Sequence, residues 1–189
     1  MGYFWLFVSP ITTALVWFFL NNQKIIQVET DIPYPLFVLI GTTVWFSFVS
    51  LVQQPLAGFN DGKPVFIKLN VPPEAFIFSA ALRAVFELFL RVLLIVPLFL
   101  LFKFTPPATA WFFPLALLFV IIPALAIGVW LVPLGSLFGD ISNAVTAFVG
   151  LFMYTVPVVF PIPDGGGMLA SIMRWNPLTP GIAFCRDLL

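Results

Sequence analysis

The chain has no histidine and only one cysteine, Cys185. A disulfide within the chain is therefore impossible, and so are a Cys/His metal site and a nucleophilic pair that depends on histidine. Charged side chains are also scarce, since they make up 8% of the 189 residues and eight positive charges balance eight negative ones. This balance excludes a disordered chain and argues against a nucleic-acid binder, which needs a basic face.

Apolar side chains take the place of the missing charges. They make up 61% of the chain, whereas a soluble domain has about 45–50%. A soluble core of this length cannot hide so much apolar surface, so the composition indicates an integral membrane protein. With only eight carboxylates and no histidine for acid–base chemistry, a transporter, a channel or a membrane scaffold is favoured over an enzyme.

Five apolar runs are candidates for membrane-spanning helices, each of which needs about 17–25 residues. They cover residues 3–20, 36–52, 76–102, 111–137 and 144–160. The runs are continuous, which excludes the alternating strands of a membrane barrel. We therefore predict an all-α, polytopic transmembrane bundle of about five spans that forms one domain over residues 1–189. Residues 161–189 are rich in proline and glycine, and they predict one or two short interfacial or re-entrant helices.

The longest hydrophilic stretch covers residues 53–73. It contains four prolines, two glycines and both Lys63 and Lys68, so it is interpreted as a broken connection with a short helix over residues 60–69. Positive charges do not orient the chain, because Lys24 and Lys103 in the opposite connections balance these two lysines.

Five stretches of sequence carry a resemblance to a known family. Their order and spacing are more specific than any single motif. They are Gly2-Tyr3-Phe4-Trp5 with Ser9-Pro10, Tyr34-Pro35-Leu36-Phe37 with Gly41 and Trp45-Phe46, Phe66-Ile67-Lys68-Leu69-Asn70-Val71-Pro72-Pro73-Glu74, Phe138-Gly139-Asp140-Ile141, and Pro157-Val158-Val159-Phe160-Pro161 with Trp175-Asn176-Pro177-Leu178-Thr179-Pro180.

With these stretches, the chain resembles the permease subunits of type-2 ABC exporters that move polysaccharides such as O-antigen, capsule or teichoic acid. The resemblance implies a multi-pass protein of the cell inner (plasma) membrane, with the 53–73 connection and Met1 inside the cell and Leu189 outside. The family has six spans and a basic amphipathic stretch before the first. The chain is therefore expected to be a fragment without the sixth span.

The resemblance also implies partners. They are an ABC ATP-binding subunit, a second permease copy, membrane lipids and a glycan or lipid-linked glycan substrate, with no nucleic acid. ATP and Mg²⁺ are expected on the partner subunit, and no cofactor or metal on this chain. A phosphate-cradling loop would need G-x-x-x-x-G-K-[ST]. The nearest match, from Gly58 to Pro64, has the wrong spacing and is interpreted as a plain turn.

The 53–73 connection is the candidate for coupling to the ATPase. A cytosolic ATPase can move the spans only through a protruding element, and a short helix here could fit into a cleft on that partner. The alternative is a solvated loop with buried apolar side chains. The candidate residues are Phe59, Asn60, Asp61, Lys63, Val65, Phe66, Ile67 and Lys68.

A second candidate site lies within the third span. Arg83, Glu87 and Arg91 are spaced by four residues and share one helix face, so Glu87 can pair with either arginine. Charges inside a membrane are costly and should face the bundle or a water-filled cavity. The three residues form either a structural ion triad or an anion-binding patch for a lipid-linked pyrophosphate group.

Aromatic residues suggest where a glycan could pass, because sugar rings stack on aromatic faces. Most of the 24 Phe and six Trp should instead face lipid or the membrane interfaces. Trp130 and Tyr154 lie deeper in their spans and are the candidates for a substrate passage. Two alternatives to glycan export remain open from the residues, a permease for a lipid or a drug and a membrane enzyme that acts on lipid-linked sugars.

Overall fold

The computed structural model describes residues 4–23, 32–93, 95–101, 107–163 and 167–188, and within these ranges the chain contains helices and no strand. The all-α prediction is confirmed for this part of the chain. The helices are α1 (Phe4–Asn22), α2 (Tyr34–Leu69), α3 (Pro73–Leu93), α4 (Ile95–Leu101), α5 (Phe113–Leu137), α6 (Ile141–Phe152), α7 (Met168–Trp175) and α8 (Thr179–Asp187), with 3₁₀ turns η1 (Ala108–Phe112) and η2 (Met153–Thr155).

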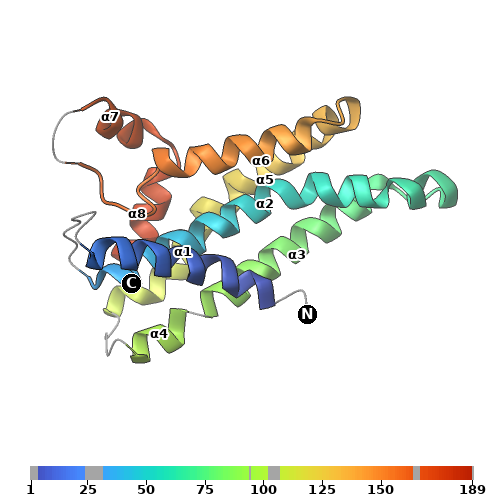
Figure 1. The fold of residues 1–189 in the computed structure, drawn as a ribbon. Coiled ribbons are helices and arrows are strands. Elements are labelled where there is room, and N and C mark those ends of the chain that lie inside the picture. Colours follow the sequence, from blue (N-terminus) through green and yellow to red (C-terminus); the bar gives the residue numbers. More distant parts are fainter. Residues whose placement is uncertain (1–3, 24–31, 94, 102–106, 164–166, 189) are drawn as a thin grey trace.

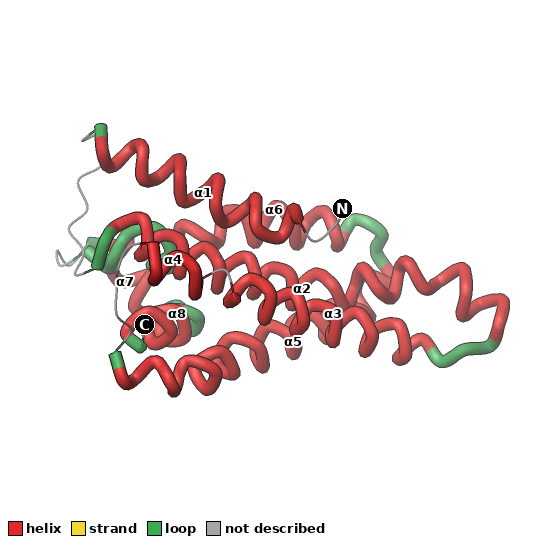
Figure 2. Tube along the Cα trace, turned by 90° about the horizontal axis from the view of Figure 1, so that it is seen from below, coloured by secondary structure: helices red, strands yellow, loops and turns green. Residues whose placement is uncertain are grey.

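Two long antiparallel hairpins form the body of the molecule (Figure 1). Helices α2 and α3 make the first, and α5 and α6 make the second. Both hairpins turn at the same end of the molecule, whereas α7 and α8 lie at the opposite end. The tip of the α2–α3 hairpin extends beyond the other helices in both views (Figures 1 and 2).

Three helical segments are long and apolar enough to cross a membrane, and they cover Phe4–Asn22, Tyr34–Leu69 and Ala108–Leu137. Helix α3 has a suitable length of 21 residues but carries four charged side chains, which are Glu74, Arg83, Glu87 and Arg91. The apolar run Ile141–Thr155 is shorter. The structure therefore supports a helical membrane bundle, while the predicted number of five spans stays a prediction.

Helix α2 is the central helix, and it corrects the sequence interpretation of residues 53–73. It packs against α1, α3, α5, α6 and α8. It continues without a break through Pro55 and Pro64 as far as Leu69, where Asn70 ends it in a left-handed conformation with a φ of 52°. The predicted broken connection is wrong, because only residues 70–72 lie between α2 and α3. Packing against α3 and α5 outweighs the backbone bonds that the prolines remove.

Glycines allow the neighbouring helices to approach α2 closely. A Cβ atom on Gly58 of α2 would collide with the side chain of Ala80 and lie 2.9 Å from the carbonyl oxygen of Phe76, both on α3. A Cβ atom on Gly128 of α5 would lie 2.7 Å from the carbonyl oxygen of Val52. These glycines therefore act as packing points and not as helix breaks.

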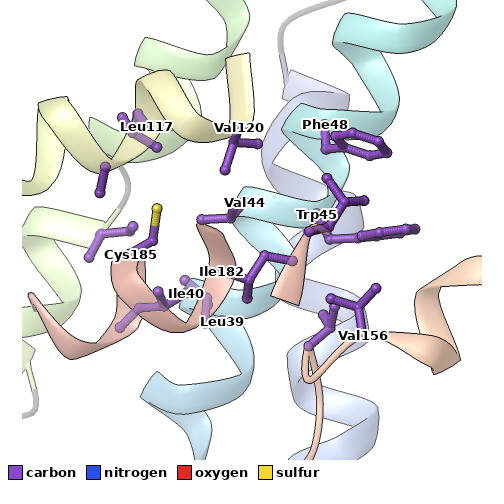
Figure 3. Close-up of a cluster of buried hydrophobic side chains, with 14 of the residues drawn as sticks. Leu39, Ile40, Val44, Trp45, Phe48, Leu117, Val120, Val156, Ile182 and Cys185 are labelled. Carbon is purple, nitrogen blue, oxygen red and sulfur yellow. The ribbon is translucent and has the colours of Figure 1, made fainter. Parts of the chain in front are cut away.

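The hydrophobic core surrounds the first half of α2. Trp45 is fully buried there and stacks on Phe48, with ring centroids 5.5 Å apart. Val120 of α5, Ile182 of α8 and the irregular segment that begins at Val156 close over this half of the helix (Figure 3). The apolar run of the second predicted span is thus buried by protein on most sides.

Polar contacts hold α8 and the segment around residues 158–159 against this core. The guanidinium of Arg186 on α8 lies 3.5 Å from the ring centroid of Phe37 and donates to the carbonyl oxygen of Val158 at 3.0 Å. The hydroxyl of Tyr34 donates to Val159 at 3.2 Å. Two short helices, α7 and α8, occur where one or two were predicted. In the non-helical stretch before α7, residues 156–159 are buried, whereas Pro161 and Pro163 are exposed.

We predict that Gly128→Ala destabilises the bundle whereas Gly150→Ala does not. Both substitutions place alanine in a helix, but the new Cβ at position 128 would lie 2.7 and 2.8 Å from two carbonyl oxygens of α2, and nothing lies within 4 Å of the one at position 150. Overpacking of this kind costs about 1–3 kcal/mol. Thermal unfolding in detergent should show a lower midpoint for Gly128→Ala only, and equal midpoints would contradict the close packing of α5 on α2.

Candidate functional site

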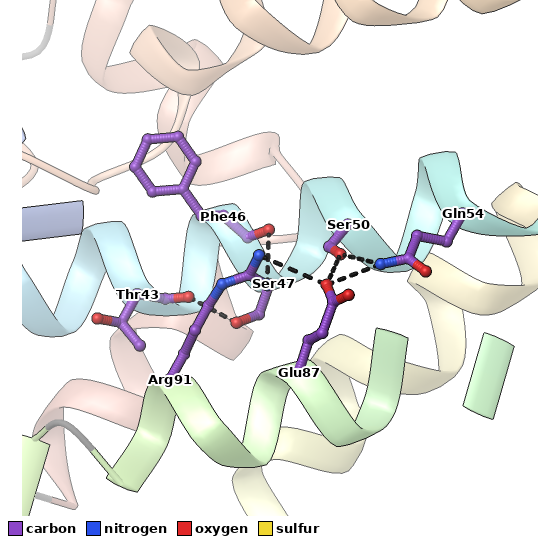
Figure 4. Close-up of polar contacts among 7 residues, drawn as sticks. All are labelled: Thr43, Phe46, Ser47, Ser50, Gln54, Glu87 and Arg91. Atoms are coloured by element: carbon purple, nitrogen blue, oxygen red, sulfur yellow. Dashed lines mark hydrogen bonds and ion pairs between the residues drawn. The ribbon is translucent and has the colours of Figure 1, made fainter. Parts of the chain in front are cut away.

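A buried polar network joins α2 to α3 in the middle of the bundle (Figure 4). Oε2 of Glu87 accepts hydrogen bonds from Gln54 Nε2 at 2.7 Å and from Ser50 Oγ at 3.0 Å. Nη2 of Arg91 lies 3.8 Å from the same oxygen. The side chains of Arg91 and Glu87 are only 8% and 12% exposed, so the pair is well shielded from solvent.

The guanidinium of Arg91 has more N–H donors than the neighbouring side chains and carbonyl groups accept. A guanidinium carries five N–H donors. Among the described residues, Arg91 makes the long ion pair with Glu87 and one weak hydrogen bond of 3.4 Å from Nη1 to the carbonyl oxygen of Phe46. Its Nε is buried and has no partner. An oxygen-rich group placed beside Arg91 would therefore find donors available.

The structure separates the three charges that the sequence grouped together. Glu87 forms its ion pair with Arg91, whereas Arg83 lies one turn away on an exposed part of α3. The helical spacing predicts that all three share a face but does not say which arginine is buried. Ser50 and Gln54 of α2 determine this, since they face α3 beside Glu87 and Arg91.

A cavity of about 370 Å³ adjoins this network, and its wall is formed by α1, α2 and α3. A volume in this range is typical of small-molecule sites. The residues around it combine aromatic rings, hydroxyls, amides and one cation. They are Trp5, Leu6, Ser9, Phe46, Val49, Ser50, Gln53, Gln54 and Arg91.

The sequence pattern identified Arg91 and its partner Glu87 but did not identify the other residues that line the cavity. Gln53 and Gln54 were assigned to a connection, although they come directly after an apolar run and so mark where α2 becomes polar. Trp5 and Phe46 were noted only as parts of family motifs. No local pattern brings α1 beside the middle of α2, so this part of the site could not have been found from spacing alone.

The candidate coupling residues lie on the outer part of α2 and divide into two groups. Phe59 and Phe66 face inward, because the ring of Phe66 lies 5.3 Å from that of Phe59 and 6.0 Å from that of Phe76 on α3. The other predicted residues are exposed. They are Asn60, Asp61, Lys63, Val65, Ile67 and Lys68. The tip of the hairpin thus has an internal aromatic core and an outer surface that mixes apolar and charged side chains.

The two predicted passage residues lie away from the cavity. Trp130 on α5 is 70% exposed and Tyr154 in η2 is 52% exposed, and neither lines the cavity beside Arg91. Within the part of the chain that the structure describes, no group of three or more His, Cys, Asp or Glu side chains could hold a metal ion.

Comparison with known proteins gives a consistent result over the length of the chain. The O-antigen export system permease protein RfbA of Klebsiella pneumoniae is 22% identical over 190 residues, which cover 100% of this chain and 72% of that protein. RfbA of Myxococcus xanthus is 22% identical over 86% of this chain and 62% of its own length. The polysialic acid transport protein KpsM of Escherichia coli is 22% identical over 99% of this chain and 73% of its own length.

The chain is similar to permease proteins of polysaccharide export systems. The predicted resemblance is confirmed by these relatives. No protein-family model matches the chain. The predicted location, a multi-pass protein of the inner membrane, is also confirmed, since the relatives are export permeases and several helices are long and apolar enough to span a membrane.

We predict that Glu87→Gln destabilises the bundle. The substitution keeps the size of the side chain but leaves Arg91 buried without its counter-charge, and breaking a buried ion pair costs about 3–5 kcal/mol. The matched control is Arg83→Gln, which removes an exposed charge from the same helix. The yield in membranes and the midpoint of thermal unfolding should fall for Glu87→Gln only. If the two variants behave alike, the pair does not stabilise the bundle.

Proposed function

We propose that the chain is the transmembrane subunit of an ATP-driven exporter that moves a polysaccharide or a lipid-linked glycan out of the cytoplasm. The observation that carries this proposal is the similarity to O-antigen and polysialic acid transport proteins over nearly the whole chain. These names favour a glycan over a drug or a plain lipid as substrate. They also favour a transport role over an enzyme acting on lipid-linked sugars.

ATP hydrolysis is assigned to a partner subunit, which would bind the ATP and Mg²⁺. The segment of this chain that is nearest to a phosphate-binding loop, residues 58–64, lies within α2 and is helical. Gly58 and Gly62 are buried against Ala80 and Phe76 of α3. Their backbone N–H groups are therefore not arranged as a loop that could cradle phosphates.

The tip of the α2–α3 hairpin is the proposed contact with that ATPase. Helix α2 has 36 residues and is about 54 Å long, whereas the apolar core of a bilayer is about 30 Å thick. Its polar second half therefore extends beyond the membrane core. Val65, Ile67 and Leu69 are exposed at this end, next to Lys63 and Lys68, which is a suitable surface for a protein partner.

A second permease copy completes the proposed transporter. Trp130 and Tyr154 are exposed on the single chain, so a passage that they line would have to form between two copies. Other exposed apolar side chains of α5 and α6, such as Ile122 and Phe148, would face the second copy or membrane lipids.

We expect Ile67→Asp to abolish export while the protein still inserts in the membrane. Ile67 is 67% exposed, so the new carboxylate does not disturb the hairpin itself but would be buried without a partner in the contact with the ATPase. Surface polysaccharide should be measured in a strain whose own gene is deleted and replaced by the variant, together with co-purification of the ATPase. The amount of surface polysaccharide should fall to that of the deletion strain, and the amount of co-purified ATPase should fall to the background level.

Two controls make this result specific. Ile67→Val keeps the side chain apolar and should restore export. Phe66→Ala removes a ring from the internal aromatic core, so it should destabilise the hairpin as well as reduce export. Normal export and normal ATPase binding by Ile67→Asp would show that the tip is not the coupling element. If the deletion strain keeps its surface polysaccharide, the proposed function is wrong.

Cysteine labelling tests the orientation that the proposal requires. In a Cys185→Ala background, Asn70→Cys and Gly139→Cys lie at the end of the molecule where the hairpins turn, and Pro107→Cys lies at the opposite end. A maleimide that cannot cross membranes should label Pro107→Cys on intact cells and reach the other two sites only after the cells are opened. Labelling of Asn70→Cys on intact cells would overturn the orientation.

A further inference from the structure

The residues that line the cavity beside Arg91 are of two chemical kinds. Trp5 of α1 and Phe46 of α2 contribute aromatic rings, and Leu6 and Val49 contribute apolar side chains. The other lining residues are polar. They are Ser9, Ser50, Gln53, Gln54 and Arg91. A ligand that fits this cavity must therefore have both an apolar face and several polar groups.

The polar residues that line the cavity can both donate and accept hydrogen bonds. Amide and hydroxyl side chains carry both kinds of atom, and Arg91 has donors to spare. The Glu87 carboxylate lies 3.8 Å from Arg91 and neutralises its charge. An anionic ligand next to Arg91 would also lie next to this carboxylate and be repelled by it, which favours a neutral ligand with many hydroxyl groups.

The position of the cavity adds to this argument. Its polar residues lie where α2 changes from an apolar to a polar helix, between Val52 and Gln53. The first apolar segment, residues 34–52, is about 28 Å long, which matches the thickness of a bilayer core. The cavity therefore lies close to the membrane interface on the side of the hairpin tip, where the first sugars of a lipid-linked glycan are found.

We propose that this cavity binds one sugar ring of the exported glycan. The C–H face of the ring stacks on Trp5 or Phe46, whose electron-rich faces attract weakly positive hydrogens. The hydroxyls of the ring bond to Gln53, Gln54 and the free donors of Arg91. The proposal rests on the proposed function, because it takes the ligand to be part of the transported polymer, and it adds a binding site on each single copy of the permease.

Octyl glycosides are suitable probes because they combine one sugar with a tail that partitions into a membrane or micelle. The full-length protein would be purified in a detergent without sugar, and its unfolding midpoint measured against octyl glucoside, octyl galactoside and octyl mannoside. Octanol controls for the tail, and octyl phosphate presents the same tail with an anionic head. Ligands that bind the folded state raise the midpoint in a concentration-dependent way.

Two variants locate the binding. Trp5 is 66% exposed, so Trp5→Ala should fold normally yet lose the stacking surface, and Gln53→Ala removes one polar group from the lining of the same cavity. The matched control is Trp111→Ala, which removes an 89% exposed ring outside the cavity. At least one glycoside should stabilise the wild type and Trp111→Ala, and the concentration needed should rise about tenfold or more in Trp5→Ala, which corresponds to about 1.4 kcal/mol.

The outcomes separate this proposal from the proposed function. Absence of a sugar-specific effect in the wild type, an equal effect in Trp5→Ala, or stronger stabilisation by octyl phosphate than by any glycoside would each overturn the sugar site. The measurement needs neither the ATPase nor export. A negative result with normal export therefore rejects only the sugar site. A positive result in a protein whose loss leaves surface polysaccharide intact rejects the exporter, and with it the assignment of the bound sugar to an exported glycan, while the sugar-binding site itself stands.

Discussion

The rest of the structure depends on the length of α2. A helix of 36 residues cannot be contained within a bilayer core of about 30 Å, so part of it must extend into the interface and beyond. The sequence of α2 fits this requirement, since the buried apolar half ends at Val52 and the polar half begins at Gln53. The helices α1, α3, α5, α6 and α8 all pack on this one helix, which therefore fixes their positions relative to one another.

The change from apolar to polar along α2 also explains how α3 can carry buried charge. An isolated arginine in an apolar helix is costly, whereas Arg91 and Glu87 pair with each other and Glu87 is further satisfied by Ser50 and Gln54. Arg91 lines a cavity, and its Nη1 and Nη2 atoms carry more N–H donors than the hydrogen bond to Phe46 and the ion pair with Glu87 use. A donor left free beside a cavity is the property expected of a binding group rather than of a purely structural one.

The apolar runs predicted most of the long helices, because burial in a membrane acts on many consecutive residues at once, and the prolines and glycines of residues 161–189 predicted the short C-terminal ones. The prediction of helix ends failed where a residue type that is common in loops also serves in helix packing. Gly58 and Gly62 resemble loop residues, but they allow α3 to approach closely, and so α2 continues through them. Likewise, the spacing of Arg83 and Arg91 from Glu87 is the same, and the contact of Arg91 with Phe46, 45 residues away, distinguishes the two arginines. Such long-range contacts leave no local pattern in the sequence.

The continuity of α2 links the two candidate sites mechanically. Ser50 and Gln54 line the cavity, and Ile67 lies at the exposed tip of the same unbroken helix, about 20 Å away along its axis. A helix transmits displacement as a rigid element, whereas a flexible connection would absorb it. Close contact of Gly128 with the carbonyl oxygens of Leu51 and Val52 couples α5 to the same region. A displacement of the tip would therefore shift the cavity wall and α5 together, which is what a partner that acts only at the tip requires.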